Sequence, residues 1–267
     1  MRRAGAMRYA ANISLLFTEW PFGDRFGAAA AAGFDGVEIL FPYDHDPGAL
    51  RDRIDAAGLD LVLINAPPPH PDRDQAGFAA TPGGEDRFRA AMERVLAVAR
   101  VLRPGRIHVM AGYCSGDDAF ATFTANLRWL ADRAPGQGLS IEPLNRGDQP
   151  GYFLNDYALA ARVLDAVDRP QLGLQFDSYH AQAIHGDAPA VWERYRDRIC
   201  HVQVGDAPGR CEPGAGGVDF AALFAAMGAQ GYAGWISAEY TPTTARTEDS
   251  LAWMRQVPAG PPRRAKT

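Results

Sequence analysis

The chain has 267 residues, three cysteines and a formal net charge of −5, from 27 Lys and Arg against 32 Asp and Glu. This balance gives no electrostatic reason to expect binding to nucleic acid or to an anionic membrane. No apolar run approaches the roughly 20 residues that cross a bilayer, and the start lacks the apolar segment of a signal peptide. The odd cysteine count, without a Cys-x-x-Cys pair, argues against a disulfide framework and a thiolate zinc site. We therefore expect a cytoplasmic protein that buries a substantial core.

Apolar segments of strand length alternate with helical patterns along the chain. The strand candidates are residues 8–13, 36–40, 59–65, 106–110, 139–142, 172–177, 199–204 and 235–239. The clearest helical patterns cover residues 85–102, 119–134, 157–167 and 220–230, and Asp156 and Asp219 are predicted N-caps of the last two. Eight alternating units in a chain of this length predict a (β/α)8 TIM barrel. We expect one domain over residues 7–257, with flexible termini over 1–6 and 258–267.

A glycine recurs where a helical stretch passes into a strand candidate, at Gly33, Gly58, Gly136 and Gly231. Glycine adopts the left-handed conformation that commonly ends a helix, so we predict that conformation at these joints. Repetition of the joint is typical of a strand–helix barrel. The first strand candidate is not followed by a Gly-x-Gly-x-x-Gly or P-loop pattern, which weakens a nucleotide-binding interpretation.

Four consecutive strand candidates in the C-terminal half each end in a polar side chain. Parallel α/β folds place their active sites at the carboxyl ends of the strands, so these side chains are expected to converge. Three carboxylates and an amide suit a hard divalent cation such as Mg²⁺ or Mn²⁺, and paired glutamates can take and return protons without an organic cofactor. The four polar residues at these strand ends are Glu142, Asp177, Gln203 and Glu239. Glu38 also ends a strand candidate, and is either a fifth site member or a structural carboxylate.

Simpler interpretations exist for the same residues. Glu142 could be an N-cap or a surface ion-pair partner, and Asp177 could be a helix cap. A lone buried glutamine such as Gln203 is more often a satisfied core amide than a ligand. The convergence of four such residues is what favours an active site.

The loop after the seventh strand candidate, residues 205–217, is rich in glycine. Loops at that end of a barrel position the substrate. Arg210 in this loop either holds a substrate carboxylate through a bidentate pair or pairs with Glu212 at the surface. No role is assigned to Cys211 or to the Pro-rich loop over residues 66–71.

Three histidines bear on the site. His180 follows Asp177 by three residues and is therefore placed beside a carboxylate. His108 and His201 occur within strand candidates and are expected to line the barrel with both ring nitrogens hydrogen-bonded.

Six segments between Met7 and about Val257 carry a family resemblance. They are AANISLLFTE (10–19), GFDGVE (33–38), HVMAG (108–112), IEPLN (141–145), FDSYH (176–180) and the stretch from HVQ (201–203) through EPG (212–214). At these residues the sequence resembles the hydroxypyruvate isomerase family, within the xylose-isomerase-like TIM barrel superfamily.

The resemblance implies an aldose–ketose type isomerase that interconverts small 2-hydroxy-3-oxo and 3-hydroxy-2-oxo acids through an enediolate. Hydroxypyruvate and tartronate semialdehyde are the smallest pair, and 2-oxo-tetronate is a close analogue. The resemblance implies Glu142 and Glu239 as the paired proton donor and acceptor. It implies metal positions at Glu142, Asp177, Gln203 and Glu239, with the metal requirement left open. The predicted substrate-binding residues are His180, Arg210, Glu212 and Asn65.

Two loops depart from the family pattern. Asn65 is followed by APPPHPD where the family usually has a Leu-Pro-x-Gly-Asp-Trp stretch, and GAGG (214–217) stands where the family has Gly-x-Gly-Glu. These departures leave the preferred substrate open. A ketose 3-epimerase or a sugar dehydratase of the same superfamily, or a non-catalytic barrel that binds a sugar acid, are the alternatives. An AP-endonuclease-like role shares the fold, but the acidic charge balance disfavours it.

Overall fold

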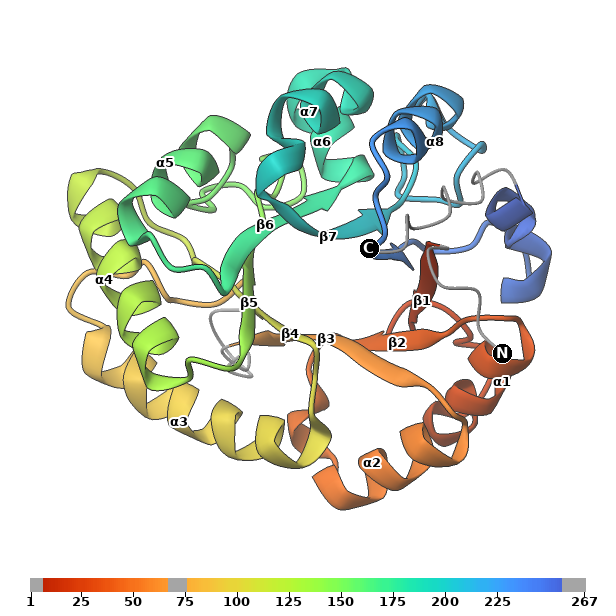
Figure 1. Cartoon of the computed structure of the whole chain (residues 1–267), viewed down its shortest axis with the longest axis horizontal. Helices are drawn as coiled ribbons and strands as arrows, with labels where there is room; N and C mark the ends of the chain where they lie inside the picture. Colours follow the sequence, from red (N-terminus) through yellow and green to blue (C-terminus); the bar gives the residue numbers. More distant parts are fainter. Residues whose placement is uncertain (1–6, 67–75, 256–267) are drawn as a thin grey trace, which may run out of the picture.

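The computed structural model describes residues 7–66 and 76–255. Eight parallel strands close into a barrel in chain order, with the last strand paired to the first (Figure 1). The predicted TIM barrel is therefore confirmed. The predicted flexible termini and most of the loop over 66–71 lie outside the described residues. The strands are β1 (Arg8–Asn12), β2 (Gly36–Ile39), β3 (Asp60–Ala66), β4 (Arg106–Val109), β5 (Gly138–Ile141), β6 (Leu172–Asp177), β7 (Ile199–Val204) and β8 (Trp235–Ala238).

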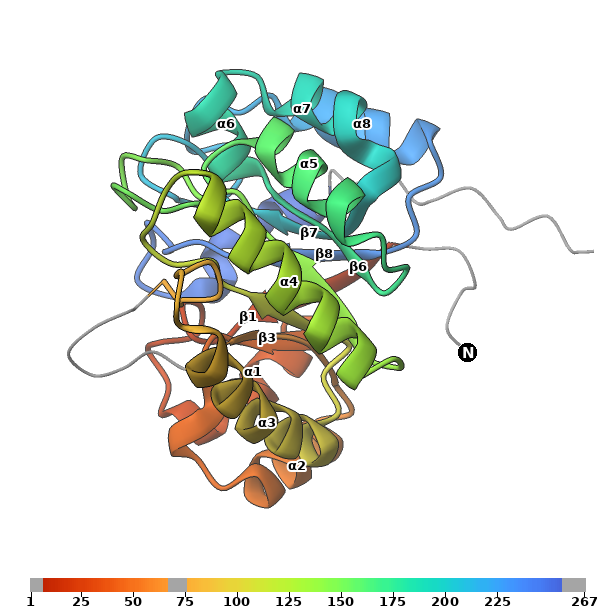
Figure 2. The ribbon, with the colours of Figure 1, turned by 90° about the vertical axis from the view of Figure 1, so that its left-hand side faces the viewer.

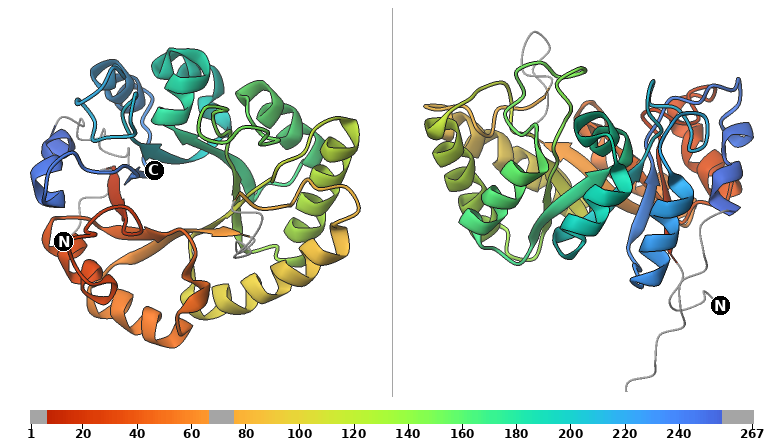
Figure 3. Two further views of the ribbon diagram at one scale, coloured as in Figure 1. Left: turned by 180° about the vertical axis from the view of Figure 1, so that it is seen from behind. Right: turned by 90° about the horizontal axis from the view of Figure 1, so that it is seen from above.

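Helices surround the barrel, as Figures 1 and 2 show from one end and from the side, and Figure 3 from the other end. Two helices separate β6 from β7, and two short 3-10 helices, Thr247–Ser250 and Ala252–Arg255, follow β8. Among the helices of the described residues, none has the length and apolar composition that a membrane crossing requires. The helices are α1 (Arg25–Ala31), α2 (Pro47–Ala56), α3 (Glu85–Leu102), α4 (Asp117–Arg133), α5 (Tyr157–Val167), α6 (Ser178–His185), α7 (Ala188–Tyr195) and α8 (Phe220–Ala229).

Local signals explain where several helices begin and end. The Asp156 carboxylate accepts from two N–H groups at the start of α5, and Asp219 accepts from Ala222 N–H at the start of α8, so both predicted N-caps are confirmed. The glycine joints at 33, 58 and 231 have positive φ values, as predicted. At 136 the prediction is wrong, since that glycine is not among the residues with positive φ. There the constraint falls on Gly138, where a Cβ would lie 2.5 Å from a backbone oxygen of the neighbouring strand connection.

The interior of the barrel is polar toward the carboxyl ends of its strands. The usual TIM-barrel interior is filled by layers of branched apolar side chains. Here each strand contributes a buried polar residue, and paired strands set these residues side by side, as in the registers Asn12↔Glu38, His108↔Ser140 and Gln175↔His201. A buried polar layer of this kind needs internal hydrogen-bond partners. The eight residues are Asn12, Glu38, Asn65, His108, Ser140, Gln175, His201 and Ser237.

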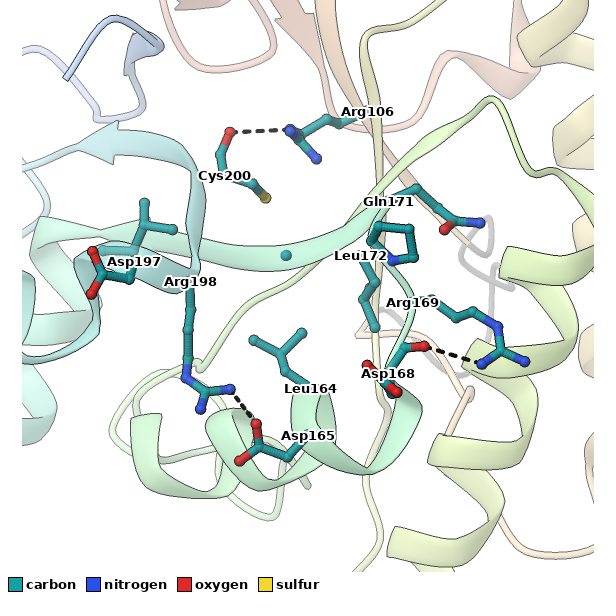
Figure 4. Close-up of a pocket in the computed structure, with 13 residues that line it drawn as sticks. Arg106, Leu164, Asp165, Asp168, Arg169, Gln171, Leu172, Asp197, Arg198 and Cys200 are labelled. Carbon is teal, nitrogen blue, oxygen red and sulfur yellow. Dashed lines mark hydrogen bonds and ion pairs between the residues drawn. The ribbon is translucent and has the colours of Figure 1, made fainter.

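The opposite end of the barrel carries a cavity of about 530 Å³ beside the amino ends of β6 and β7 (Figure 4). Several of its charged side chains have partners within the fold, since Arg198 binds Asp165 at 2.6 Å and Arg106 Nε donates to the Cys200 carbonyl at 3.1 Å. Residues at the amino end of a TIM barrel serve stability, whereas catalytic residues lie at the carboxyl end. We therefore place the candidate active site at the carboxyl end.

Candidate active site

The four strand-end residues predicted from the sequence are buried at the carboxyl end of the barrel. Glu142, Asp177, Gln203 and Glu239 are each at most 5% exposed. Arg210 joins two of them, because its Nη2 lies 2.7 Å from Asp177 Oδ2 and 3.1 Å from Glu239 Oε2. Three carboxylates and a guanidinium therefore share one water-poor site.

Asp177 serves both as a helix cap and as a member of this site. Its Oδ1 accepts a hydrogen bond of 2.8 Å from the Tyr179 N–H at the start of α6, and its Oδ2 faces Arg210. The capping interpretation is thus confirmed for Oδ1, whereas the role of Oδ2 in the candidate site stays a prediction. The cap fixes the orientation of the carboxylate and directs Oδ2 into the site.

A series of hydrogen-bonded amide side chains holds one oxygen of Glu142. Gln175, which no motif marked, donates from Nε2 to Glu142 Oε2 at 2.9 Å and to Gln203 Oε1 at 2.7 Å. Its own Oε1 accepts from the Ser140 hydroxyl at 2.9 Å. Glu142 Oε1 is buried and has no hydrogen-bond partner within the described residues. One oxygen of Glu142 is therefore held in place while the other is free for chemistry.

Glu38 lies at the other end of this series of hydrogen bonds. Its two carboxylate oxygens contact His201 Nε2 and Gln203 Nε2, the latter at 2.8 Å. A carboxylate only accepts hydrogen bonds, so Gln203 turns its amide nitrogen to Glu38 and its oxygen toward Gln175. The contacts of Glu38 are those of a positioning carboxylate, which orients Gln203, and Gln203 has partners for both ends of its amide.

The histidines divide into a site residue and barrel-lining residues. His180 is buried, and its Nδ1 accepts from the Asn145 N–H at 3.1 Å, so its proton sits on Nε2, which lies 3.9 Å from Asp177 Oδ2. His108 Nδ1 lies 3.2 Å from Asn65 Oδ1, so Asn65 contacts one of the histidines that line the barrel. His108 and His201 do line the barrel, but the expectation that both nitrogens of each are bonded is wrong. His108 Nε2 and His201 Nδ1 have no partner within the described residues.

Arg210 and Glu212 have separate partners. Arg210 binds Asp177 and Glu239, whereas Glu212 accepts hydrogen bonds from the N–H and the hydroxyl of Thr243, the former at 2.9 Å. The surface pair between Arg210 and Glu212 that the sequence also allowed is therefore wrong. A contact between Glu212 and substrate stays a prediction. Cys211, in the same loop, is buried, and its Sγ lies 3.7 Å from the Pro208 carbonyl oxygen.

Burial shifts the pKa values of the site carboxylates upward. Burial, together with the charges of Glu239 and Asp177, raises the pKa of Glu142 well above its usual range. Burial raises the pKa of Glu239 to about 8, although Arg210 opposes this shift. Burial also lowers the pKa of His180 well below its usual range, with a further contribution from Arg210, so His180 is neutral. Both pKa shifts favour the protonated form of these glutamates at neutral pH.

These shifts predict that the metal-free chain loses stability as the pH rises from about 5 to about 8.5. The pKa of Glu239 rises from 4.5 to about 8 on folding, so over this range the folded chain holds a proton that the unfolded chain has released. The stabilisation is complete below about pH 4.5 and is lost as the pH approaches 8. In a chelating buffer, calorimetry should show the melting temperature of the wild type falling roughly 10 °C further than that of Glu239→Gln, whose amide does not titrate. Equal falls in the two proteins would contradict the shift.

The donor atoms of the site fit a divalent cation. Within the described residues, Glu142, Asp177 and His180 each offer a ligand atom, and these atoms lie within 4.8 Å of one another. The free Glu142 Oε1 is a buried oxygen without a partner, which is what a metal ligand provides before binding. The set of carboxylates with one histidine suits Mg²⁺ or Mn²⁺ better than a thiolate-preferring metal. The site can therefore hold such a cation on its carboxylates. His180 lies close enough to join them, but it would first have to lose the Nε2 proton, because its Nδ1 accepts from the Asn145 N–H.

Comparison with known proteins agrees with this architecture. The chain is 42% identical over 254 residues to the 2-oxo-tetronate isomerase of Cupriavidus necator, and the alignment covers 93% of this chain and 97% of that protein. It is 35% identical to the hydroxypyruvate isomerase of Escherichia coli, over 93% of this chain and 98% of that protein. A crystal structure from Brucella melitensis, described as an AP endonuclease of family 2, superposes with a TM-score of 0.88 at 38% identity and covers 93% of this chain and 98% of that one.

A family model extends the agreement over most of the barrel. The model, described as xylose isomerase-like TIM barrel, matches residues 26–257. The match spans every strand except β1, and includes all four strand ends that carry the carboxylates and the amide. The chain therefore belongs to the xylose isomerase-like TIM barrel family, together with relatives named hydroxypyruvate isomerase and 2-oxo-tetronate isomerase.

Proposed function

We propose that the protein is an isomerase that interconverts small 2-hydroxy-3-oxo and 3-hydroxy-2-oxo acids, either hydroxypyruvate and tartronate semialdehyde or a close analogue such as 2-oxo-tetronate. The observation that carries the proposal is the pair Glu142 and Glu239. Both are buried, they come from strands three places apart in an eight-strand ring, and burial keeps a proton available at neutral pH. The names of the relatives at 35–42% identity support the same reaction class.

The reaction needs only proton transfers. One glutamate removes a proton from the carbon that bears the hydroxyl group, and a proton is delivered to the former carbonyl carbon. The hydroxyl proton moves to the neighbouring oxygen, so one C–H bond breaks, one forms, and no oxidant or reductant is required. Glu142 Oε1 and Glu239 Oε2 are the oxygens suited to these transfers, because Gln175 and Asn12 hold the other oxygen of each carboxylate. Glu239 Oε2 becomes available when Arg210 turns to the substrate carboxylate.

A divalent cation would be held by Glu142, Asp177, Gln203 and Glu239, with His180 close by. Such a cation supplies polarisation of the substrate carbonyl and stabilises the negative charge that develops on the substrate oxygens. Mg²⁺ or Mn²⁺ fits these oxygen donors, and an organic cofactor is not needed. The requirement for the metal is part of the proposal.

Arg210 is the proposed anchor for the substrate carboxylate. Its planar guanidinium can form two parallel hydrogen bonds to a carboxylate, which gives orientation as well as affinity. His180 presents an Nε2–H beside Asp177 and is the proposed donor to a substrate oxygen. Asn65 and Glu212 are proposed to contribute at the edge of the site.

The proposal is tested with a panel of hydroxy-oxo acids and neutral ketoses, each incubated with the purified protein with and without Mn²⁺. We expect conversion of an acid, and we expect Arg210→Ala to raise the KM for that acid by roughly tenfold or more. Turnover of a ketose that Arg210→Ala leaves unchanged, with no acid converted, would instead support a 3-epimerase or dehydratase. Tight binding of a sugar acid without turnover would support a binding barrel. A cytoplasmic location, a homo-oligomer and the absence of a nucleic-acid partner stay predictions.

A further inference from the structure

We propose that Arg210 and the divalent cation compete for the same carboxylate oxygens, and that the substrate carboxylate decides the competition by drawing Arg210 away. Arg210 would thereby make metal binding depend on the acid substrate. The identity of the acid rests on the proposed function, whereas the competition rests only on the contacts of Arg210.

The first observation is which oxygens remain for a cation. Asp177 Oδ1 accepts from the Tyr179 N–H at 2.8 Å, and Glu239 Oε1 accepts from the Asn12 amide at 3.0 Å. In these two carboxylates, the oxygens that accept neither of these hydrogen bonds are Asp177 Oδ2 and Glu239 Oε2. Arg210 Nη2 contacts both, at 2.7 and 3.1 Å. A cation bound to these two oxygens would lie close to the guanidinium, and the repulsion between the two positive charges would favour movement of Arg210 away from them.

The second observation is how the guanidinium is held. Its closest contact with each carboxylate is through Nη2, and Nε is buried without a hydrogen-bond partner within the described residues. A guanidinium binds a carboxylate best when two of its nitrogens face the two oxygens. The pair with Asp177 and Glu239 is thus not the arrangement that arginine favours, whereas a substrate carboxylate can offer both oxygens to the fork.

The third observation is that only the side chain has to move. The backbone of Arg210 is held by its carbonyl, which accepts from the Thr241 N–H at 2.9 Å, and by the backbone pair between Asp206 and Cys211. The side chain is 29% exposed and lies 5.4 Å from the centre of the Tyr179 ring, so it borders both the site and the solvent. A rotation of the side chain toward solvent, with its backbone unmoved, would release the two carboxylates.

The consequence is a thermodynamic coupling between two ligands. If the acid takes Arg210 and the cation takes the released carboxylates, each ligand raises the affinity for the other by the same factor. Direct contact between acid and cation also couples them, but that part does not depend on Arg210. The contribution of Arg210 is therefore the difference between the wild type and a variant that lacks the guanidinium.

The test measures the affinity for Mn²⁺ by isothermal titration calorimetry, with and without hydroxypyruvate. Arg210→Met keeps the length of the side chain and removes its charge and donors, and we expect it to bind Mn²⁺ alone about tenfold or more tightly than the wild type. Arg146→Met is the matched control, since Arg146 is an exposed cation at the same end of the barrel whose guanidinium binds Asn155. Its Mn²⁺ affinity should stay within about twofold of the wild-type value. Hydroxypyruvate should tighten Mn²⁺ binding more in the wild type than in Arg210→Met.

An unchanged or weaker Mn²⁺ affinity in Arg210→Met, or an equal gain in both arginine variants, would overturn the proposal. A second measurement needs no variant. A crystal structure of the wild type with Mn²⁺ should show Arg210 released from Asp177, and a bound ion beside an intact Arg210–Asp177 pair would also overturn it. Neither measurement uses the rate of turnover as its readout. Competition for Mn²⁺ without any acid isomerisation would therefore reject the proposed function and leave the competition standing.

Discussion

Replacement of Glu142 or Glu239 by glutamine is expected to lower kcat for the acid substrate by of order 10²-fold or more. An amide keeps the shape of the side chain and one acceptor oxygen, although at Glu239 it loses the ion pair with Arg210, and it can neither remove nor donate the proton that moves between carbon atoms. The two residues occupy different strands and have different partners, so neither can replace the other. Turnover measured at saturating substrate and saturating Mn²⁺ separates this loss from weaker binding.

Two controls accompany these variants. Glu93→Gln removes a carboxylate on the surface of α3, where Glu93 pairs with Arg133, and it should leave kcat unchanged. The metal content of each glutamine variant is measured as well, because the replaced carboxylates are proposed ligands. Full turnover in a correctly folded, metal-loaded Glu142→Gln or Glu239→Gln protein would remove that glutamate from the mechanism.

The second large effect is expected at Asp206, which no motif marked. This buried carboxylate accepts hydrogen bonds from four backbone N–H groups of the loop after β7, at distances of 2.8–2.9 Å. Asp206→Ala leaves these donors without their acceptor and should lower the free energy of unfolding by about 3–4 kcal/mol. The melting temperature should fall by roughly 10 °C, measured by calorimetry. The four N–H groups belong to Ala207, Gly214, Gly216 and Val218.

The same substitution should affect substrate binding, because the loop carries Arg210. We expect KM for the acid to rise more than kcat falls, since the chemistry of Glu142 and Glu239 is not altered. Asp206→Asn is the matched variant. It retains one oxygen but presents an NH₂ group to two of the N–H donors, so its stability should lie between those of the wild type and Asp206→Ala. A melting temperature of Asp206→Ala within about 2 °C of the wild type would show that the carboxylate does not organise the loop.

The fold and the outer layer of the site could be predicted because they depend on local patterns. Strand-length apolar segments that end in a carboxylate or an amide identify β5 to β8 together with the candidate site residues at their ends. Helices α3 and α5 begin and end at the predicted residues, since apolar periodicity and the Asp156 cap are local signals. The convergence of Glu142 and Glu239 with Asp177 follows once the strands are parallel.

The supporting layer could not be predicted in the same way, although a signal for it exists. Side chains two residues apart on a strand point to the same face. Ser140, Gln175 and His201 each lie two positions before a predicted site residue and therefore face the barrel interior. Their partners depend on the registers between β4, β5, β6 and β7, which the sequence of a single strand does not specify.

Arg210 shows the limit of local reasoning most clearly. Glu212, two residues away in the sequence, is the obvious candidate for an ion pair with Arg210. The actual partners of Arg210 are Asp177, which lies 33 residues earlier on β6, and Glu239, which follows β8. Burial explains the choice. The carboxylates of Asp177 and Glu239 lie in a site with little water and need a cation more than the half-exposed Glu212 does.

The most direct test of the two-glutamate account follows deuterium in the substrate. Wild type, Glu142→Gln and Glu239→Gln are incubated with hydroxypyruvate and Mn²⁺ in deuterated water, and NMR follows both exchange at the carbon beside the carbonyl and conversion to the isomer. Conversion is followed because complete internal return of the proton would leave no deuterium in the product. We predict exchange or conversion by the wild type and a loss of both, by of order 10²-fold, in each variant. Proton exchange at the wild-type rate in either variant would contradict the account.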